Sequence, residues 1–339
     1  MIVDIGGGTA DLTVHEKLDD GTLKEICRSN GDSCGGLNVN RAYIKILEYI
    51  MKLQKPLKDE LTSINLEDYL MRDFEAAKRV FVPNKTEKIS INIPYTSMDK
   101  LCKSQHNTSL ENRLQSSSFA ESVKMRFDDS VIKCIFRDTI EKIIALIQNT
   151  LERIWVTQID HIVLVGGFAE CSLLKNMVQE KFVDMKKIII PVNCGLSVLQ
   201  GAVLFGHKPE FIGTRVMQYT YGIGTNDPYS AEKHDKAHFR IHDGQELCRN
   251  AFNILVAKNE QVKAGICVKK RYKSTHFYAE NTIRLYYSVV QSQVYTDQME
   301  CIHLGTLSVK IPNPEITYDL NVTVTFGMCE LQVEVTETT

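Results

Sequence analysis

The stretch "MIVDIGGGTADLTV", residues 1–14, decides how the rest of the chain is interpreted. Three consecutive glycines stand between two short apolar segments, 2–5 and 11–14, which predict two strands joined by a tight turn. Glycines at such a turn permit positive φ angles and allow a ligand to come close to the main chain. Asp4 precedes the glycines and Asp11 follows them. The segment therefore predicts a small concavity of backbone N–H groups flanked by two carboxylates.

This combination favours phosphate binding over a plain glycine hairpin with two solvated acids. The predicted phosphate-binding groups are the backbones of Gly6, Gly7 and Gly8 and the hydroxyl of Thr9. Asp4 and Asp11 carry oxygen acceptors that can hold Mg²⁺ through its water molecules beside the phosphates.

Composition limits the function classes. The chain has 339 residues with a formal net charge of -2, which gives no electrostatic reason to expect nucleic acid or an anionic membrane as a partner. Apolar runs such as "VLQGAVLFG" (198–206) have the size of core segments and are too short to span a bilayer. The ten cysteines are scattered without any C-x-x-C pair, and no signal-peptide pattern opens the chain. These features predict a cytoplasmic protein without a zinc site.

The chain changes character near residue 208. Before it, apolar spacing predicts alternating strands and helices. The expected helices are 38–53, 66–81, a long block at 121–154, 170–183 and 196–206, with strands at 88–95, 159–168 and 187–191 and a polar loop at 100–120. From 213 onward, short alternating β-branched and aromatic segments predict an all-β sandwich-like unit. Two domains are therefore expected, 1–208 and 209–339.

Two further motifs carry candidate site residues. Glu75, Lys78 and Arg79 lie three and four residues apart, on one face of the predicted helix 66–81, so their charged ends can converge on a ligand. A solvated salt-bridge face is the alternative interpretation. The segment "HIVLVGGFAECSLLKNMV" (161–178) runs from a buried strand through Gly166 and Gly167 into a helix. This turn fits either a second ligand contact or simple strand-to-helix packing.

Taken in order, these motifs resemble one family. "DIGGGTADLT", "SNGDSCGGLNVNRAYIKIL" (29–47), "FEAAKRVF" (74–81), "IVLVGGFAECSLLKNMV" and "GLSVLQGAVLFG" (195–206) resemble the second lobe of the actin-like ATPase of the 70-kDa heat-shock proteins. The later segments, such as "YTYGIGTN" and "LNVTVTFGMCELQVEVTE", follow the order of that family's β-sandwich domain. The resemblance covers nearly the whole chain and looks most like the atypical heat shock 70 kDa protein 12 branch.

The resemblance implies a fold, a ligand and roles for the motifs. The fold would be an α/β second lobe of an actin-like ATPase, with a helical and strand-containing lid insertion at about 38–154, followed by the all-β domain. The ligands would be ATP or ADP with Mg²⁺, and the partners would be polypeptide clients in a chaperone or stress-response role. Glu75, Lys78 and Arg79 would line the adenosine side, and Gly166, Gly167 and Phe168 would lie along the nucleotide.

Departures from the family pattern leave alternatives open. Val82, Glu170 and Gly195 stand where typical members carry Ser, Arg and Asp. The glycine hairpin opens this chain but lies midway through the family's ATPase, so an N-terminal truncation and weak or absent ATP hydrolysis are expected. An interaction or scaffold protein with a vestigial nucleotide site is the main alternative, and a sugar-kinase-like enzyme is less favoured. Residues Tyr221–Thr225 fit either a peptide-contacting segment or a plain core strand.

Overall fold

The computed structural model consists of two compact units. The first unit contains Met1–Thr13 and Asn30–Val203, and the second contains Val14–Ser29 and Leu204–Thr339. The structure describes residues 1–53, 57, 66–84, 88–114, 120–121, 124–153, 159–182, 187–242, 244–274, 280–313, 315–328 and 330–338. Pro56, the proline that follows the predicted helix 38–53, lies outside these residues.

A mixed sheet carries the glycine turn in the first unit. The part of this sheet around the turn has the strand order β2-β1-β7-β8. Their bounds are β1 Ile2–Ile5, β2 Ala10–Lys17, β7 His161–Val165 and β8 Lys187–Ile189. β1 runs antiparallel to β2 and parallel to β7, and β7 runs parallel to β8. Val3, Ile5 and Leu12 are buried because alternate residues of each strand face the core. These strands confirm the predicted strand–turn–strand at the start of the chain.

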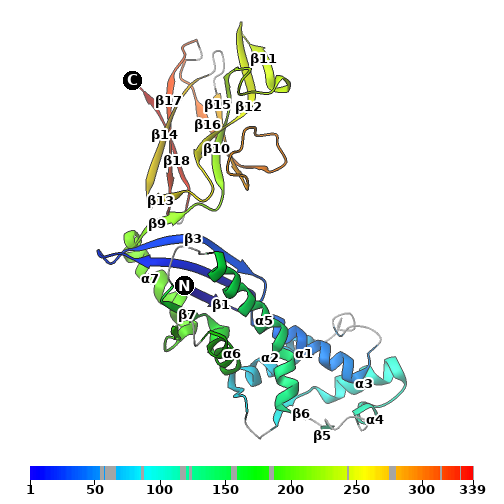
Figure 1. The fold of residues 1–339 in the computed structure, drawn as a ribbon. Coiled ribbons are helices and arrows are strands. Elements are labelled where there is room, and N and C mark those ends of the chain that lie inside the picture. The colour runs from blue at the N-terminus through cyan, green and yellow to red at the C-terminus, as the bar shows by residue number, and fades with distance from the viewer. Residues whose placement is uncertain are drawn as a thin grey trace. The chain divides into compact units, whose positions relative to one another are not determined.

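The first unit also contains helices that pack against one another (Figure 1). They are α1 Gly36–Met51, α2 Leu66–Val80 and α5 Asp129–Arg153, and α1 packs against both of the others. The ring of Tyr43 stacks on Phe74 with the centroids 4.2 Å apart and meets the edge of Phe127 at 5.9 Å. Helix α1 ends at Lys52, whose left-handed backbone lets its N–H donate to the carbonyls of Glu48 and Tyr49.

The segment between α2 and α5 differs from the sequence prediction. It contains β4 Ile89–Asn92, α3 Tyr95–His106, α4 Leu110–Leu114, β5 Ala120–Glu121 and β6 Lys124–Phe127. The predicted polar loop at 100–120 is wrong over 100–106 and 110–114, where a few buried residues (Leu101, Cys102, Leu110) anchor two helices. The predicted helical block at 121–154 is wrong at its start, because 124–127 pairs with β4.

A helix with no buried residue runs across the end of the first unit. The predicted helix 170–183 is a 3₁₀ turn, Gly167–Glu170, followed by α6 Ser172–Phe182. The next helix, α7 Ser197–His207, forms where it was predicted, but none of its residues is buried. Leu199 is 64% exposed and Val203 is 68% exposed. The apolar run at 198–206 therefore does not fill a core in the described structure.

Two antiparallel sheets make up the sandwich of the second unit. One has the order β11-β12-β10-β15-β16 and the other β14-β17-β18. The bounds of the first are β10 Thr220–Pro228, β11 Phe239–His242, β12 Gln245–Val256, β15 Glu280–Ser288 and β16 Cys301–Lys310. The second contains β14 Ile266–Lys273, β17 Asp319–Phe326 and β18 Gln332–Thr338.

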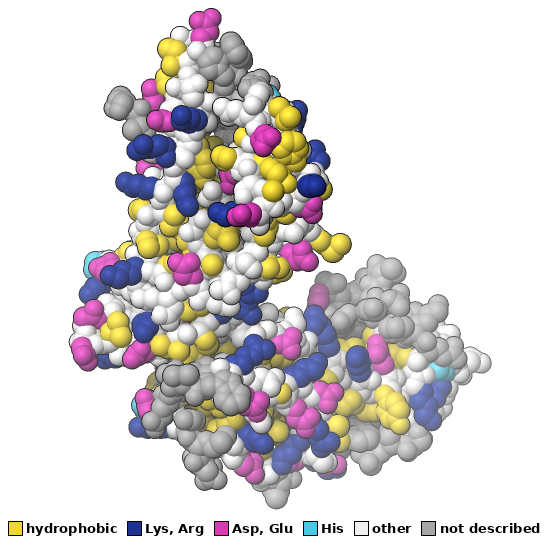
Figure 2. Space-filling view, turned by 45° about the horizontal axis from the view of Figure 1, so that its top comes forward, with side chains coloured by type: hydrophobic (Ala, Val, Ile, Leu, Met, Phe, Trp, Pro, Cys, Tyr) yellow, Lys and Arg dark blue, Asp and Glu magenta, His cyan; other side chains and the backbone are white. Residues whose placement is uncertain are grey.

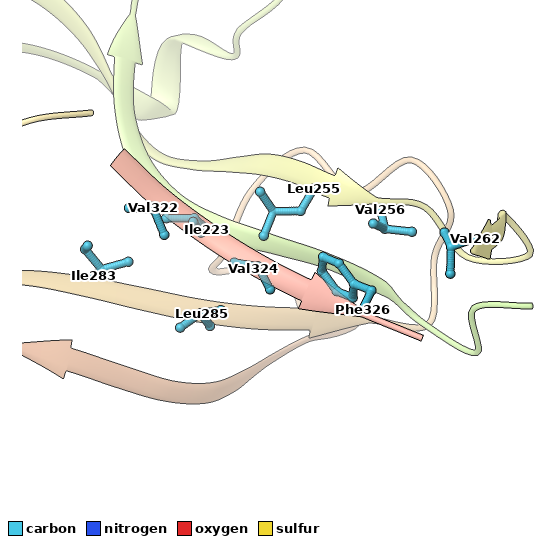
Figure 3. Close-up of a cluster of buried hydrophobic side chains, with 9 residues drawn as sticks. All are labelled: Ile223, Leu255, Val256, Val262, Ile283, Leu285, Val322, Val324 and Phe326. Atoms are coloured by element: carbon cyan, nitrogen blue, oxygen red, sulfur yellow. The ribbon is translucent and has the colours of Figure 1, made fainter. Parts of the chain in front are cut away.

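The sandwich core lies between these sheets (Figure 3). Ile223, Ile283 and Leu285 of one sheet pack with Val322, Val324 and Phe326 of the other. Strand β17 alternates strictly between buried and half-buried residues, which is the pattern of a strand with one face in the core. The structure therefore contains a mixed α/β part and an all-antiparallel β part, as the sequence predicts.

Three more strands, with most of their residues in the second unit, meet around one buried acid. They are β3 Leu23–Asp32, β9 Ile212–Val216 and β13 Gln261–Lys263. The Glu25 carboxylate accepts a hydrogen bond from the Val216 N–H at 2.9 Å, and its carbonyl accepts one from Gln261. Burial raises the pKa of Glu25, although the Val216 N–H opposes that shift. In the part of the chain that the structure describes, no helix is both long and apolar enough to cross a bilayer.

Candidate functional site

The glycine turn is fixed from behind by the start of α1. Gly6 N–H donates to the Thr9 carbonyl at 3.0 Å and closes the turn. The carbonyls of Gly8, Gly6 and Gly7 accept hydrogen bonds from the N–H groups of Gly35, Gly36 and Leu37, at 3.1, 3.0 and 2.7 Å. A Cβ on Gly35 would lie 2.4 Å from the Gly7 carbonyl oxygen, so only glycine allows this approach. The turn is thus held by its carbonyls.

The N–H side of the same turn is open. Gly7, Gly8 and Thr9 are exposed. Among the described residues, the N–H groups of Gly7 and Gly8 have no acceptor. Two neighbouring exposed N–H groups on a fixed turn form a small donor surface suited to an anion.

The reason for three glycines differs from the sequence prediction. The described glycines with a left-handed φ are Gly21, Gly166, Gly244, Gly265 and Gly327, so this turn does not use the positive φ angles that its glycines permit. A Cβ on Gly8 would have no atom within 4 Å, and one on Gly7 would only reach Leu37 at 3.8 Å. Neither backbone conformation nor packing inside the protein therefore requires glycine at positions 7 and 8. What the glycines leave is empty space above two free N–H groups.

Two carboxylates stand next to this surface. Asp4 and Asp11 are directly opposite each other in the β1–β2 pair, so their side chains are on the same face. Partial burial raises the pKa of Asp4, and the negative charge of Asp11 raises it further. The Thr9 hydroxyl donates to the Asp11 carboxylate at 2.8 Å, so in this structure its proton is engaged by Asp11. The pair is a concentration of negative charge that a cation would relieve.

The end of β7 packs against the same carboxylate. Gly166 has φ +91°, and a Cβ there would lie 2.4 Å from Asp4 Oδ1 and 2.5 Å from the Ile5 carbonyl oxygen. Glycine is therefore required at this position. Gly166 therefore packs against Asp4, as the packing interpretation of this turn predicts, and its contact with a ligand stays a prediction.

A cleft of about 390 Å³ runs beside the glycine turn. Its lining includes seven of the predicted site residues: Gly6, Gly7, Glu75, Lys78, Arg79, Gly167 and Phe168. The other five, Asp4, Gly8, Thr9, Asp11 and Gly166, belong to the hairpin and its β7 neighbour and do not line this cleft. The structure thus gathers the predictions into two adjoining groups that share the glycine turn.

The Lys78 side chain is buried in the protein and is not a free cation at the cleft surface. Its side chain is only 5% exposed and forms an ion pair with Glu75. The ammonium also donates to the Gly36 carbonyl at 3.0 Å and to Asn40 Oδ1 at 2.9 Å. All three N–H donors are therefore engaged by the protein. Burial lowers the pKa of Lys78, and the Glu75 carboxylate opposes that shift.

Glu75 and Arg79 complete this network at the cleft. Burial works to raise the pKa of Glu75, but hydrogen bonds from Lys78 and Asn40 outweigh it, and the net pKa is lowered. Arg79 is 71% exposed and reaches Glu75 at 3.4 Å. Of the three, Arg79 has the most freedom to meet a ligand.

The sequence prediction missed several lining residues. They are Gly36, Leu37, Asn40, Asp68, Met71, Arg72, Glu170 and Cys171. Asp68, Met71 and Arg72 lie seven, four and three residues before Glu75, so the helical period alone could have found them. Asn40 gave no such signal, because its role depends on α1 and α2 packing together.

The departures from the family pattern fall in different places. Glu170 lines the cleft, and a Cβ on Gly195 would lie 2.8 Å from its carboxylate. Val82 is 41% exposed and does not line the cleft. In the described residues, no group of three or more His, Cys, Asp or Glu side chains forms a metal cluster. A cation here would therefore depend on the Asp4–Asp11 pair.

Comparisons with known proteins cover most of the chain. Residues 1–157 match the model of a domain of unknown function, DUF8340. Human heat shock 70 kDa protein 12A is 33% identical over 282 residues, which are 80% of this chain and 41% of that protein. Human heat shock 70 kDa protein 12B is 29% identical over 80% of this chain and 40% of its own length. Chaperone protein DnaK of Carsonella ruddii is 28% identical over 66% of this chain and 35% of its own length.

These matches confirm the resemblance seen in the motifs. The chain spans about two fifths of the length of the curated relatives that it matches. The chain is a distant homologue of the 70-kDa heat-shock proteins, with similarity to heat shock 70 kDa protein 12A over 80% of its residues.

Proposed function

We propose that the first unit binds a nucleoside di- or triphosphate with Mg²⁺, as an actin-like ATPase lobe of an atypical 70-kDa heat-shock protein. The observation that carries this proposal is the pair of exposed N–H groups at Gly7 and Gly8, which have no acceptor among the described residues. The space above them, which no packing requirement explains, suits the close approach of a phosphate.

The Asp4–Asp11 pair fits the cation of such a ligand. The raised pKa of Asp4 reflects burial and then the neighbouring charge of Asp11, and a cation relieves both costs of ionisation. Asp4 and Asp11 would hold Mg²⁺ through its waters, and the ion would supply positive charge to the phosphate oxygens. Thr9 orients Asp11 through its hydroxyl.

The adjoining cleft would receive the nucleoside. Arg79 and Glu75 offer polar groups at its α2 wall, and Phe168 offers an aromatic ring. Lys78 acts by holding α2 against the start of α1, since its donors are all engaged. Glu170 faces the same cleft, so the contacts to the base differ from those of relatives with an arginine there.

The proposal is for binding without rapid hydrolysis. Phosphoryl transfer requires groups on several sides of the transferred phosphate. The phosphate-facing residues assembled here, Asp4, Gly7, Gly8, Thr9 and Asp11, all belong to one hairpin. We further propose that the second unit, called the β-rich unit from here on, binds polypeptide segments, in line with the homology to a chaperone protein.

A calorimetric titration tests the nucleotide proposal. Mg·ATP and Mg·ADP are titrated into the wild-type chain, into Asp4→Ala and into a control, Asp20→Asn, whose carboxylate lies in the second unit and bonds Thr22. We expect binding to wild type and to the control, and a loss of about tenfold or more in affinity for Asp4→Ala. Absence of binding by the wild type would reject the nucleotide proposal for this chain.

A scaffold protein with a vestigial site is the second candidate function. The engagement of Lys78 by Glu75, Asn40 and Gly36 favours it, because an ammonium whose three donors are engaged has no hydrogen bond left to donate to a ligand. If this alternative is correct, the titration shows no nucleotide binding, and the β-rich unit still binds a polypeptide partner.

A further inference from the structure

A cavity of about 700 Å³ opens in the β-rich unit, within the size range of known ligand sites. Strands β10, β12 and β15 of one sheet and β14 and β17 of the other contribute its lining. Ile223, Ile283 and Leu320 are buried and form an apolar floor. The cavity therefore offers both an apolar surface and a polar surround.

The charged side chains around it are mostly basic. Its cations are Arg240, Arg249, Lys273 and Arg284, and its carboxylates are Asp227 and Glu280. The chain as a whole has a net charge of -2, so this excess of positive charge is local. On the face drawn in Figure 2, Lys and Arg side chains of the β-rich unit lie on both sides of a hydrophobic stretch.

These cations are not neutralised by the protein. Within the described chain, none of the four forms an ion pair with a carboxylate, and the Arg249 guanidinium donates only to the Ala237 carbonyl at 3.4 Å. Lys273 is opposite Asp319 across the β14–β17 pair, while Arg284 is opposite Gly224, which has no side chain. Arg240, Arg249 and Arg284 are thus open to an incoming anion, and Arg249 and Arg284 lie on β12 and β15, the two strands that flank β10.

Two hydroxyl groups at the same cavity also lack partners. Thr225 Oγ1 and Tyr272 Oη are buried and have no hydrogen-bond partner among the described residues. Burial raises the pKa of Tyr272, so its hydroxyl remains a donor at any physiological pH. A buried hydroxyl without a partner is costly, and an oxyanion ligand would satisfy it.

We propose that this cavity binds an acidic polypeptide segment, with an apolar side chain on the floor of Ile223, Ile283 and Leu320 and Asp or Glu carboxylates on Arg249 and Arg284. The proposal rests on the proposed polypeptide binding by the β-rich unit and adds its charge preference. Planar guanidinium groups suit carboxylates because they can donate two parallel hydrogen bonds. The apolar floor favours a peptide side chain over a simple inorganic anion.

Fluorescence anisotropy with three labelled peptides tests the preference. The peptides share one Leu-Val centre and carry Glu, Gln or Lys on both flanks. We expect the Glu peptide to bind about tenfold more tightly than the Lys peptide, with the advantage shrinking as salt is raised. Equal binding of the three peptides, or tighter binding of the Lys peptide, overturns the proposal.

Matched variants connect the preference to the cavity. The double variant Arg249→Gln/Arg284→Gln should lose the preference for the Glu peptide, whereas Arg271→Gln should keep it, because Arg271 is an exposed cation of β14 outside the lining. Tyr272→Phe should weaken the Glu peptide without lowering the melting temperature, since the lost hydroxyl has no partner in the free protein. A double variant with unchanged preference overturns the assignment to this cavity.

The outcomes separate this inference from the function on which it rests. If the three peptides bind equally, the charge preference fails while polypeptide binding stands. If no peptide binds, both fail. The Mg·ATP titration is independent of either result, because its residues lie in the first unit.

Discussion

At the scale of single residues, the Asp4 carboxylate lowers the stability of the ligand-free protein but serves the proposed cation site. Its folded pKa is raised above the ordinary value of 3.8 by burial and then by Asp11. A raised carboxyl pKa contributes stability only below the unfolded pKa, and that contribution is lost as pH rises through the folded pKa. At pH 7 the ionised Asp4 therefore destabilises the ligand-free fold.

We predict that Asp4→Asn raises the melting temperature of the ligand-free protein at pH 7. The gain should shrink as pH falls and vanish only below about 3, well under the unfolded pKa, where Asp4 is protonated in both states. Asp20→Asn is the matched control and should lower the melting temperature at pH 7. Its expected effect is opposite because hydrogen bonds from Thr22 lower the pKa of Asp20. Differential scanning fluorimetry across pH measures both variants. A lower melting temperature for Asp4→Asn at pH 7 contradicts this account of the hairpin.

Lys78 is predicted to be a structural residue. In Lys78→Met, the Glu75 carboxylate and Asn40 lose their partner, and breaking such a buried pair costs about 3–5 kcal/mol. We expect the lower end of that range, because Glu75 is 33% exposed. Arg79→Gln, at a 71% exposed side chain, should cost less than about 1 kcal/mol. Urea unfolding gives both values, and equal costs would show that Lys78 does not hold α2.

At the scale of elements, the turn after β7 depends on one glycine. Gly166→Ala places a Cβ against Asp4 and the Ile5 carbonyl at φ +91°. The backbone strain alone costs roughly 1–3 kcal/mol, and the contact adds to it. Gly167→Ala is the control, because a Cβ at that neighbour has no atom within 4 Å. Unfolding free energies measure the difference, and equal stability of the two variants would mean that β1 and β7 approach each other less closely.

The strands of the first sheet could be predicted because their pattern is local. β1 and β7 have alternating or continuous apolar residues in short runs with clear turn residues beside them. Helices α3 and α4 could not be predicted, because only a few of their residues are buried and the rest are polar. The hairpin residues of the candidate site stand out in the sequence for the same local reason. Asn40 was missed because its role arises only where α1 meets α2.

At the scale of the whole molecule, α7 presents an apolar surface. The apolar spacing predicted this helix, but it could not predict that the apolar side chains are exposed. No residue of the helix is buried. Exposed apolar patches favour association with other surfaces. We predict that Leu199→Lys/Val203→Lys lowers the binding of a hydrophobic dye and lowers self-association in sedimentation, without lowering the melting temperature.

The matched control for α7 is a substitution in the preceding helix. Leu174 of α6 is fully buried, so Leu174→Lys should unfold the first unit. If the two α7 substitutions destabilised the protein as strongly as Leu174→Lys, the apolar face of α7 would have to be buried within the chain.

The central claim is that the glycine turn binds phosphate through the free N–H groups of Gly7 and Gly8. Gly8→Ala tests it most directly, because the added Cβ meets no protein atom within 4 Å but enters the space that a phosphate would occupy. The measurement is a calorimetric titration of Mg·ADP into wild type and Gly8→Ala, with unfolding of both followed in parallel. The account predicts unchanged stability and a loss of about tenfold or more in affinity. Unchanged affinity in a stably folded Gly8→Ala would contradict it.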